Sequence, residues 1–325
     1  MSPTAGLPVV VSCGEPAGVG PEVAARARAA IGNDIPIVWV GDPRHLPAGT
    51  AFELIGAPQD ATGVADGVLA VLGHDFGSAA TPGQPEPDHA QHVIDVIARG
   101  VDLVRAGQAC ALCTAPIHKK ALMEGAGFAY PGHTEYLAAL AGVRDVVMML
   151  ASDTLRVVPA TIHIALEQVP VRLTPDGLRR TIEITSAGLR DQFGIHAPRL
   201  AIAGLNPHAG EGGAMGHQEI EWILPLIETM KAEGHDLRGP LPADTMFHAQ
   251  ARARYDAAIA MYHDQALIPI KTLDFDRGVN VTLGLPFVRT SPDHGTAFDI
   301  AGKGIANPTS MIEALRLAHK MAAAS

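Results

Sequence analysis

The sequence is poor in cysteine, in aromatic residues and in positive charge. Among its 325 residues are three cysteines, aromatic residues make up 4%, and the formal net charge is -10 at pH 7. So few aromatic side chains disfavour a platform on which bases stack, and the acidic balance disfavours non-specific binding to nucleic acid or to an anionic membrane. We therefore expect no nucleic-acid partner, and any anion site has to be local.

Long apolar runs and a secretory signal are also lacking. No run approaches the roughly 20 apolar residues that cross a bilayer, and the first residues lack the succession of basic, apolar and small residues of a signal peptide. We therefore expect no membrane partner and a cytoplasmic location. An odd number of cysteines fits such a reducing compartment.

Two of the cysteines, Cys110 and Cys113, have the spacing of a redox pair or of half a zinc site. They lie, however, in an apolar stretch typical of a buried strand. There, an offset of three residues points the two side chains to opposite faces. We favour buried structural thiols over a redox or metal role.

Hydrophobic residues are abundant, at 47% of the chain, and the length exceeds that of one ordinary domain, which predicts two domains with large cores. Short apolar or β-branched runs alternate with longer helical patterns, which predicts an α/β fold with a mostly parallel sheet. The expected strands are residues 9–12, 35–40, 68–72, 109–114, 146–150, 156–162, 200–205, 258–262 and 279–283. The expected helices are residues 21–30, 90–105, 134–140, 175–193, 217–233 and 309–321, with proline- and glycine-rich breaks at 82–87 and 234–242.

Three of the fifteen histidines stand out by their position. His163, His208 and His263 each follow an expected strand. Open α/β sheets gather ligands at the carboxyl ends of their strands, and three neutral imidazoles with an open coordination position make a catalytic divalent-metal site. A single histidine in such a place is more often a core or loop residue. Three at equivalent strand ends favour metal binding instead.

Two glycine-rich segments suggest ligand contacts. In residues 294–308 the glycines let backbone N–H groups approach a flat or phosphorylated ligand, although a simple connection before the last helix is the alternative. Near the amino terminus, Gly18 and Gly20 precede Pro21, which fits either an anion site at a helix N-terminus or a tight strand-to-helix turn. Its spacing matches neither a Walker loop nor a Rossmann fingerprint.

These segments also carry a family resemblance. Residues 294–308 resemble the nucleotide-binding loop of the isocitrate and isopropylmalate dehydrogenases, with Phe298 in place of a proline. Six blocks in order along nearly the whole chain resemble the 4-hydroxythreonine-4-phosphate dehydrogenase family. These blocks are residues 14–22, 131–135, 204–211, 239–245, 261–265 and 280–291.

The resemblance implies a two-domain isocitrate/isopropylmalate dehydrogenase-like α/β fold with a mostly parallel sheet and an interdomain cleft. Residues 1–135 with 290–325 would form the first domain, which includes the cofactor loop. Residues 136–289 would form the second, which carries the metal ligands and the dimer interface. The implied activity is the NAD(P)- and metal-dependent oxidation of 4-phosphohydroxythreonine, with decarboxylation to 3-amino-2-oxopropyl phosphate, in pyridoxal phosphate biosynthesis.

The resemblance also implies residue roles. His163, His208 and His263 would bind one divalent ion (zinc, magnesium, cobalt or manganese) at a site shared between the two subunits of a homodimer. The implied substrate-binding residues, suited to a small phosphorylated substrate, are His133, Thr134, Lys271, Asn280 and Arg289. The implied contacts to NAD or NADP are His294, Gly295, Thr296, Ala297 and Asn307. The candidates for proton transfer are Asp244, Asp264 and Lys119.

Alternative functions stay open at this point. One is a related oxidative decarboxylase of a cyclic dihydrodiol carboxylate or of another four-carbon phosphorylated hydroxy acid. Another is a nucleotide- or metal-binding protein without turnover. His133 with Thr134, together with residues 280–289, favours the phosphorylated substrate, while Lys271 and Arg289 taken alone are equally typical of surface cations.

Overall fold

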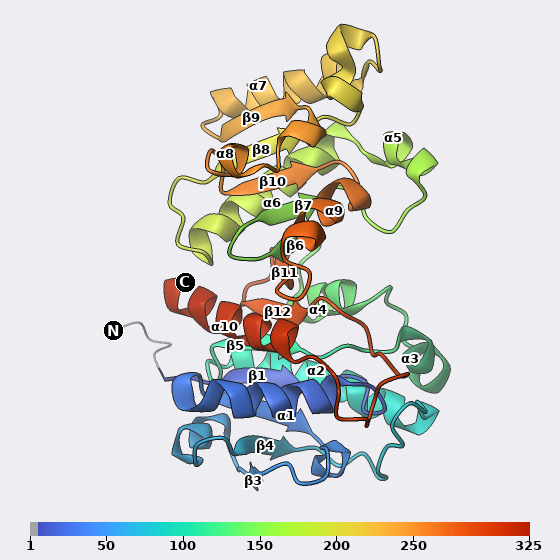
Figure 1. The fold of residues 1–325 in the computed structure, drawn as a ribbon, viewed down its shortest axis with the longest axis vertical. Helices are drawn as coiled ribbons and strands as arrows, with labels where there is room; N and C mark the ends of the chain where they lie inside the picture. Colours follow the sequence, from blue (N-terminus) through green and yellow to red (C-terminus); the bar gives the residue numbers. More distant parts are fainter. Residues whose placement is uncertain (1–5) are drawn as a thin grey trace. The chain divides into compact units, whose positions relative to one another are not determined.

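The chain folds into two compact units, described here for residues 6–325 of a computed structural model (Figure 1). The first unit runs to Arg144 and includes Leu285–Ala324, and the second is Asp145–Gly284. The first five residues, which the expected first domain includes, lie outside the described residues. The expected boundary at residue 135 falls within helix α4 (His133–Ala141), and that helix belongs as a whole to the first unit.

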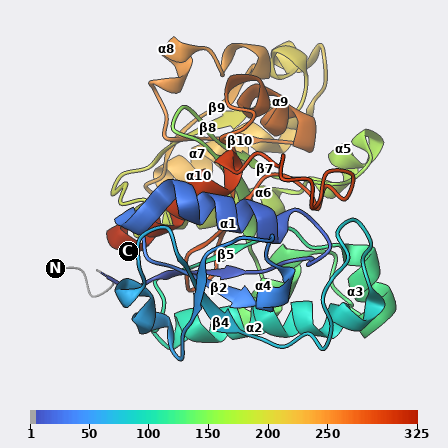
Figure 2. The same ribbon diagram turned by 60° about the horizontal axis from the view of Figure 1, so that its bottom comes forward.

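The first unit has strands in the order β3-β4-β2-β1-β5-β12, and neighbouring strands run parallel. Helices cover both faces, so the central strands are entirely buried (Figure 2). The strands are β1 (Val9–Ser12), β2 (Ile37–Gly41), β3 (Phe52–Leu54), β4 (Leu69–Gly73), β5 (Ala111–Thr114) and β12 (Arg289–Pro292). The helices are α1 (Gly20–Ile31), α2 (Ala90–Arg105), α3 (Lys119–Ala126), α4 and α10 (Thr309–Ala324).

The second unit has strands in the order β11-β6-β7-β10-β8-β9. Strand β6 is antiparallel to both neighbours, whereas β7, β10, β8 and β9 run parallel. The strands are β6 (Val147–Ala151), β7 (Arg156–Pro159), β8 (Arg199–Ala203), β9 (Asp236–Leu241), β10 (Ala257–Ala260) and β11 (Val279–Leu283). The helices are α5 (Val169–Arg172), α6 (Pro175–Asp191), α7 (Leu224–Ala232), α8 (Ala249–Arg252) and α9 (His263–Leu273).

Small side chains on the strands determine how closely helix α9 packs in the second unit. Ala203 on β8 and Ala258 and Ala260 on β10 are fully buried in one cluster with Ala266 and Ile270 of α9. Because the strand residues that pack against it are small, the helix lies close to the sheet, and its first residue stands near the carboxyl end of β10. This packing fixes the position of His263.

The α/β fold and the mostly parallel sheet expected from the sequence are confirmed, and each expected strand is present with small shifts at its ends. The expected break at residues 234–242 is wrong, because strand β9 occupies most of it. Strand β9 lies at the edge of its sheet, where Pro240 costs no internal ladder bond. The expected helix at 217–233 is divided into a π-helical turn, Glu219–Ile223, and α7.

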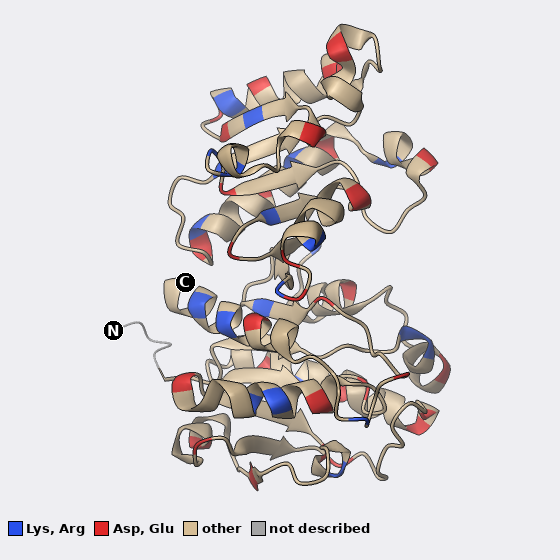
Figure 3. Cartoon of the chain, in the orientation of Figure 1, with Lys and Arg blue, Asp and Glu red and all other residues tan. Residues whose placement is uncertain are grey.

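Acidic and basic residues are interspersed along the ribbon of both units in the view of Figure 3. Within residues 6–325, none of the helices combines the length and the hydrophobicity that a bilayer span requires.

Candidate functional site

The three selected histidines follow three neighbouring parallel strands of the second unit. His163 follows β7, His208 lies in a short 3₁₀ segment after β8, and His263 begins α9 directly after β10. Strand β10 pairs with β7 on one side and with β8 on the other, both in parallel. The carboxyl ends of these strands therefore bring all three imidazoles to one edge of the sheet.

The backbone at two of these histidines is in an unfavourable conformation. His163 has a φ of 55° and His208 a φ of 51°, both in the left-handed region that residues with a Cβ rarely adopt. Ala209 and Glu211 beside His208 share this conformation, with φ of 52° and 42°. Such strain costs about 1–3 kcal/mol per residue and concentrates at functional sites. These two turns are therefore candidates for ligand binding.

The third histidine is oriented by its neighbour in the chain. Nδ1 of His263 lies 2.7 Å from Oδ1 of Asp264, so the ring donates its Nδ1–H to the carboxylate. This arrangement fixes the tautomer and leaves Nε2 with its lone pair, as in many histidines that ligate metals. Because Asp264 is 69% exposed, the pair contributes orientation and little stability.

Buried polar side chains hold the loops that carry the histidines. Glu219, 2% exposed, accepts hydrogen bonds from the backbone N–H and the side-chain amide of Asn206 at 2.8 and 2.9 Å, two residues before His208. Gln265 accepts from the Met261 N–H at 2.6 Å and donates to the Gly204 carbonyl at 2.8 Å, which ties the end of β10 to the end of β8. Sequence reasoning assigned no role to either Glu219 or Gln265.

The histidines converge only in part within one chain. The ring centroids of His163 and His263 are 5.6 Å apart. Among residues 6–325, however, the strand-end histidines do not form a trio whose ligand atoms all lie within 4.8 Å of one another. One chain alone therefore presents a pair of neighbouring imidazoles and a third on the adjacent turn.

Two candidates for proton transfer line one pocket of the second unit. Asp244, in the 3₁₀ turn Ala243–Thr245, and Asp264 border a hollow of about 450 Å³ together with Tyr262, Gln265 and Ile268. The substrate candidates of this unit lie elsewhere on it. Lys271 is half-buried on α9 with its Nζ 5.6 Å from the Phe275 ring, and Asn280 is on β11 opposite Leu150.

Cationic groups gather in the first unit. Arg289 on β12 is 2% exposed and donates from Nη2 to Thr114 Oγ1, and burial lowers the pKa of its guanidinium to about 10. His133 opens α4, followed by the half-buried Thr134. Burial first, and then the charges of Arg289 and Lys119, hold the pKa of His133 well below its usual value. Within residues 6–325, the buried Nε2 of His133 has no hydrogen-bond partner. These groups together favour an anionic ligand.

Acidification is expected to destabilise the protein through His133. Below about pH 6.5, His133 binds a proton in the unfolded chain but stays neutral in the folded protein. The free energy of unfolding therefore falls by about 1.4 kcal/mol for each pH unit, until the pH reaches the pKa of folded His133. Between pH 7 and pH 5, urea denaturation should show the wild type losing up to about 2 kcal/mol more than His133→Gln.

The exposed His196 provides the matched control for this measurement. His196→Gln makes the same exchange at an exposed position and controls for the substitution itself. Equal losses in His133→Gln and the wild type would mean that folded His133 protonates normally.

The expected cofactor loop follows β12 and is anchored on α1. The Thr296 carbonyl accepts from the Val19 N–H at 2.9 Å, and Glu22 accepts from the Ala306 N–H at 2.9 Å. Ala297 has a φ of 45°, a further residue in the left-handed region. Within the described chain, Nε2 of His294 is buried and unpartnered, while Gly295 is exposed. The loop is thus held firmly and keeps an unsatisfied polar atom, which fits a ligand-binding role.

The side chain of Asn307 is engaged at the start of the last helix. Its Oδ1 accepts hydrogen bonds from the N–H and the hydroxyl of Thr309, so this side chain also caps α10.

The glycine block before α1 is closely packed by protein atoms. A Cβ on Gly14 would lie 2.4 Å from the Pro116 carbonyl oxygen, and one on Gly18 would lie 2.9 Å from the Thr296 carbonyl oxygen. The tight strand-to-helix turn therefore describes this block, not an open anion site.

The cysteines behave as structural residues. Cys13, Cys110 and Cys113 are free and buried. Burial raises the pKa of Cys110 to about 11 and that of Cys113 to about 12, so neither forms a thiolate at neutral pH. Cys110 precedes β5 and Cys113 lies within it. Burial and the raised pKa values favour the structural interpretation of this pair over the redox and zinc ones.

The sequence matches a known protein family. The family model described as pyridoxal phosphate biosynthetic protein PdxA matches residues 33–318. The chain belongs to this family. A PdxA-family relative, a 4-hydroxythreonine-4-phosphate dehydrogenase of Roseobacter denitrificans, is 69% identical over 324 residues, which cover 99% of each chain.

Solved structures support the same family assignment. A 4-hydroxythreonine-4-phosphate dehydrogenase of Klebsiella pneumoniae is 38% identical, with a TM-score of 0.90 over 99% of this chain and 98% of that chain. A terephthalate 1,2-cis-dihydrodiol dehydrogenase of Burkholderia xenovorans is 28% identical, with a TM-score of 0.66 over 97% of this chain and 98% of that chain. The chain is thus structurally similar to an enzyme named for a terephthalate cis-dihydrodiol.

Proposed function

We propose that the chain is a 4-hydroxythreonine-4-phosphate dehydrogenase. It oxidises the secondary alcohol of 4-phosphohydroxythreonine to a ketone beta to the carboxylate, with hydride transfer to NAD or NADP and loss of the hydroxyl proton. The bond to the carboxylate then breaks, carbon dioxide leaves, and a proton replaces it to give 3-amino-2-oxopropyl phosphate. The observation that carries the proposal is the match over 99% of the chain to a relative of that name.

The donor set of the second unit fits a divalent ion held by His163, His208 and His263. Imidazole nitrogens suit zinc and cobalt better than magnesium, with manganese between them. Backbone strain at His163 and His208 and the tautomer fixed at His263 both support ligation. Such an ion would supply Lewis acidity to the oxygen of the reacting alcohol and of the ketone.

The first unit supports recognition of the phosphorylated substrate. Arg289 offers a buried guanidinium with fixed geometry, Lys119 adds a second positive charge, and His133 presents a neutral ring with an unsatisfied nitrogen. Thr134 adds a hydroxyl at the start of α4. In the second unit, Lys271 and Asn280 are the proposed substrate contacts.

The loop after β12 supports binding of the nicotinamide cofactor, which when bound accepts the hydride. His294, Gly295, Thr296 and Ala297 would contact it through the exposed backbone of Gly295 and the unsatisfied Nε2 of His294. Asn307 would contribute its amide nitrogen, because its oxygen caps α10. The chain's own contribution is therefore to orient the cofactor.

For proton transfer we retain Asp244, Asp264 and Lys119. Asp244 and Asp264 border one pocket, which supports a role near the strand-end histidines. Asp264 also accepts from His263, so it orients a metal ligand at the same time. Lys119 lies close enough to His133 to lower its pKa, which supports a role near the phosphate.

The test of the proposed function is NAD(P)H formation against a panel of substrates. The panel comprises 4-phosphohydroxythreonine, other four-carbon phosphorylated hydroxy acids and a cyclic dihydrodiol carboxylate. Preferred oxidation of 4-phosphohydroxythreonine supports the proposal. Preference for the dihydrodiol would instead align the chain with the relative named for one. If the chain binds NAD or NADP but forms no NAD(P)H with any of these substrates, it is a binding protein without turnover.

We further propose a homodimer whose metal site is completed across the interface. Large apolar side chains are exposed on the segments that follow the three strand ends: Leu166 at 69% after β7, Ile220 at 50% after β8, and Ile268 at 61% on α9 after β10. A second copy of the chain would cover these side chains and supply the ligand that one chain does not bring into a closed trio.

Mixing two inactive variants should restore activity if the site is shared. A hybrid of His208→Ala and His263→Ala subunits keeps one site with all its ligands if His208 and His263 of that site come from different subunits. Random exchange should recover about a quarter of the wild-type activity. Each variant taken through the same exchange alone is the control, and no recovery despite proven exchange would place His208 and His263 of one site in the same chain.

A further inference from the structure

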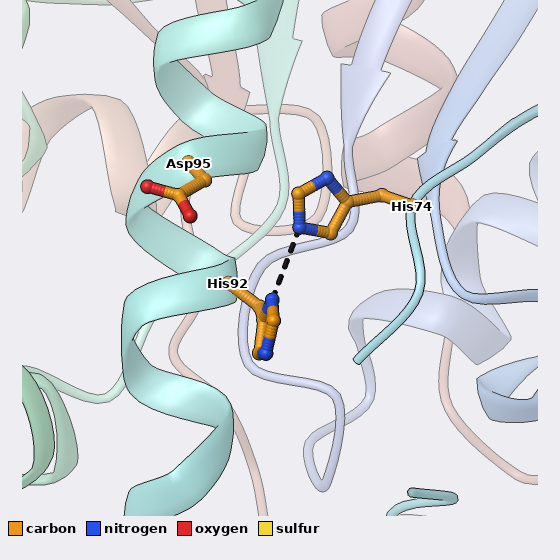
Figure 4. Close-up of side chains that lie close together, drawn as sticks. All are labelled: His74, His92 and Asp95. Atoms are coloured by element: carbon orange, nitrogen blue, oxygen red, sulfur yellow. Dashed lines mark hydrogen bonds between the residues drawn. The ribbon is translucent and has the colours of Figure 1, made fainter. Parts of the chain in front are cut away.

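A second cluster of potential metal ligands lies in the first unit. His74 directly follows β4, while His92 and Asp95 are one turn apart on α2 (Figure 4). One ligand atom from each residue lies within 4.8 Å of the other two. We propose that His74, His92 and Asp95 form a second site, which binds a divalent ion of the zinc class.

The spacing of the two imidazoles suits a shared ion. Nε2 of His74 and Nδ1 of His92 are 3.2 Å apart. Two nitrogens at about 2.0–2.1 Å from one tetrahedral ion are separated by about 3.3 Å, so the rings need little movement to bind it. Asp95, at i+3 from His92, presents its carboxylate on the same face of the helix.

The chemistry of the trio also suits zinc. Two imidazoles and one carboxylate, with room for a water, form a common zinc ligand set. Gln91 donates to Asp95 Oδ1 at 2.8 Å and steadies the carboxylate.

The loop that carries His74 is held in place without a metal. Asp42 accepts from the Phe76 N–H at 2.9 Å, and the ring of His45 contacts the Ser78 carbonyl at 3.1 Å. The Ser78 hydroxyl lies 2.9 Å from Nε2 of His89. The Phe76 ring packs against His45, His74, His89 and His92, with ring centroids 4.9 to 5.7 Å away. The ligands are thus preorganised on a rigid scaffold.

An ion at this site would tie the end of β4 to α2 and close the intervening segment into a loop. This segment contains residues 82–87, and its Gly83 N–H donates to the Ala17 carbonyl at 2.7 Å, in the glycine block before α1. A Cβ on Gly302 of the cofactor loop would lie 2.7 Å from Pro82. The ion would therefore stabilise a segment that packs directly against the cofactor loop.

Zinc counting on the full-length protein tests the second site apart from the proposed function. The background is His163→Ala/His208→Ala, which removes the strand-end ligands and leaves the first unit intact. The stripped protein is equilibrated with Zn²⁺ alone, and bound zinc per chain and the melting temperature are measured. We expect one zinc per chain and a zinc-dependent rise in melting temperature, both lost when His92→Ala is added.

Matched variants keep the result interpretable. Asp95→Asn preserves shape and should weaken zinc binding at least about 10-fold, whereas Asp102→Asn, an exposed carboxylate on the same helix, should leave it unchanged. If His92→Ala fails to fold, the comparison of Asp95→Asn with Asp102→Asn decides whether zinc binds at the second site. No zinc in the background variant, or zinc retained equally with Asp95→Asn, overturns the second site. Failure of the strand-end site would appear separately, as equal zinc in the wild type and the background.

Discussion

Dephosphorylated 4-hydroxythreonine is expected to be at least about 10³-fold poorer than 4-phosphohydroxythreonine in kcat/KM, which corresponds to about 4 kcal/mol. The buried guanidinium of Arg289 beside His133 and Lys119 offers charge-assisted hydrogen bonds that a neutral hydroxyl does not replace. Binding energy from the phosphate also holds the reacting carbon in place, so the loss should appear in kcat as well as in KM. Steady-state NAD(P)H formation with both substrates measures it.

A pair of variants tests whether Arg289, with Lys119 and His133, is responsible for the preference for the phosphorylated substrate. Arg289→Met should narrow the gap between the two substrates, whereas Lys120→Met, which removes an exposed lysine next to Lys119, should leave the gap unchanged. Circular dichroism establishes that both variants are folded. Comparable turnover of the two substrates by the wild type would remove the phosphate assignment.

His208→Ala is expected to lower kcat by roughly 10²-fold or more. Its imidazole is one of three proposed metal ligands, and it lies in a turn with a strained left-handed backbone. Removing the ring removes the ligand, and no hydrogen bond of the loop anchor Glu219 is lost with it. The variant should accordingly be no less stable than the wild type while it retains less divalent metal after dialysis. His196→Ala, an exposed histidine of the same unit, is the matched control and should keep full activity. Full activity with unchanged metal content in His208→Ala would contradict the ligand assignment.

Sequence periodicity predicted the strands that precede the three histidines but not every element around them. Strands β7, β8 and β10 are short and apolar, so their pattern alone identifies them. Strand β12 was not predicted because its residues, Arg-Thr-Ser-Pro, are polar yet buried through hydrogen bonds such as that from Thr290 to the Ala314 carbonyl. Helix α9 was missed because Pro269 interrupts its pattern.

The sequence also left out interactions that depend on tertiary structure. The left-handed backbone at His163 and His208 has no local signal, because neither position is occupied by glycine. Glu219 acts as a buried anchor for the loop of His208 although it reads as one more polar residue of a helix. The cluster of His74, His92 and Asp95 forms only because the 82–87 segment returns the chain to α2 beside β4.

One measurement tests the central claim most directly. Protein verified as metal-free is given 4-phosphohydroxythreonine with NAD or NADP, before and after addition of zinc, cobalt, manganese or magnesium, and NAD(P)H and carbon dioxide are quantified together. The account predicts neither product without metal and equal amounts of both once a competent ion is restored. Undiminished formation of both products by the metal-free protein would contradict it.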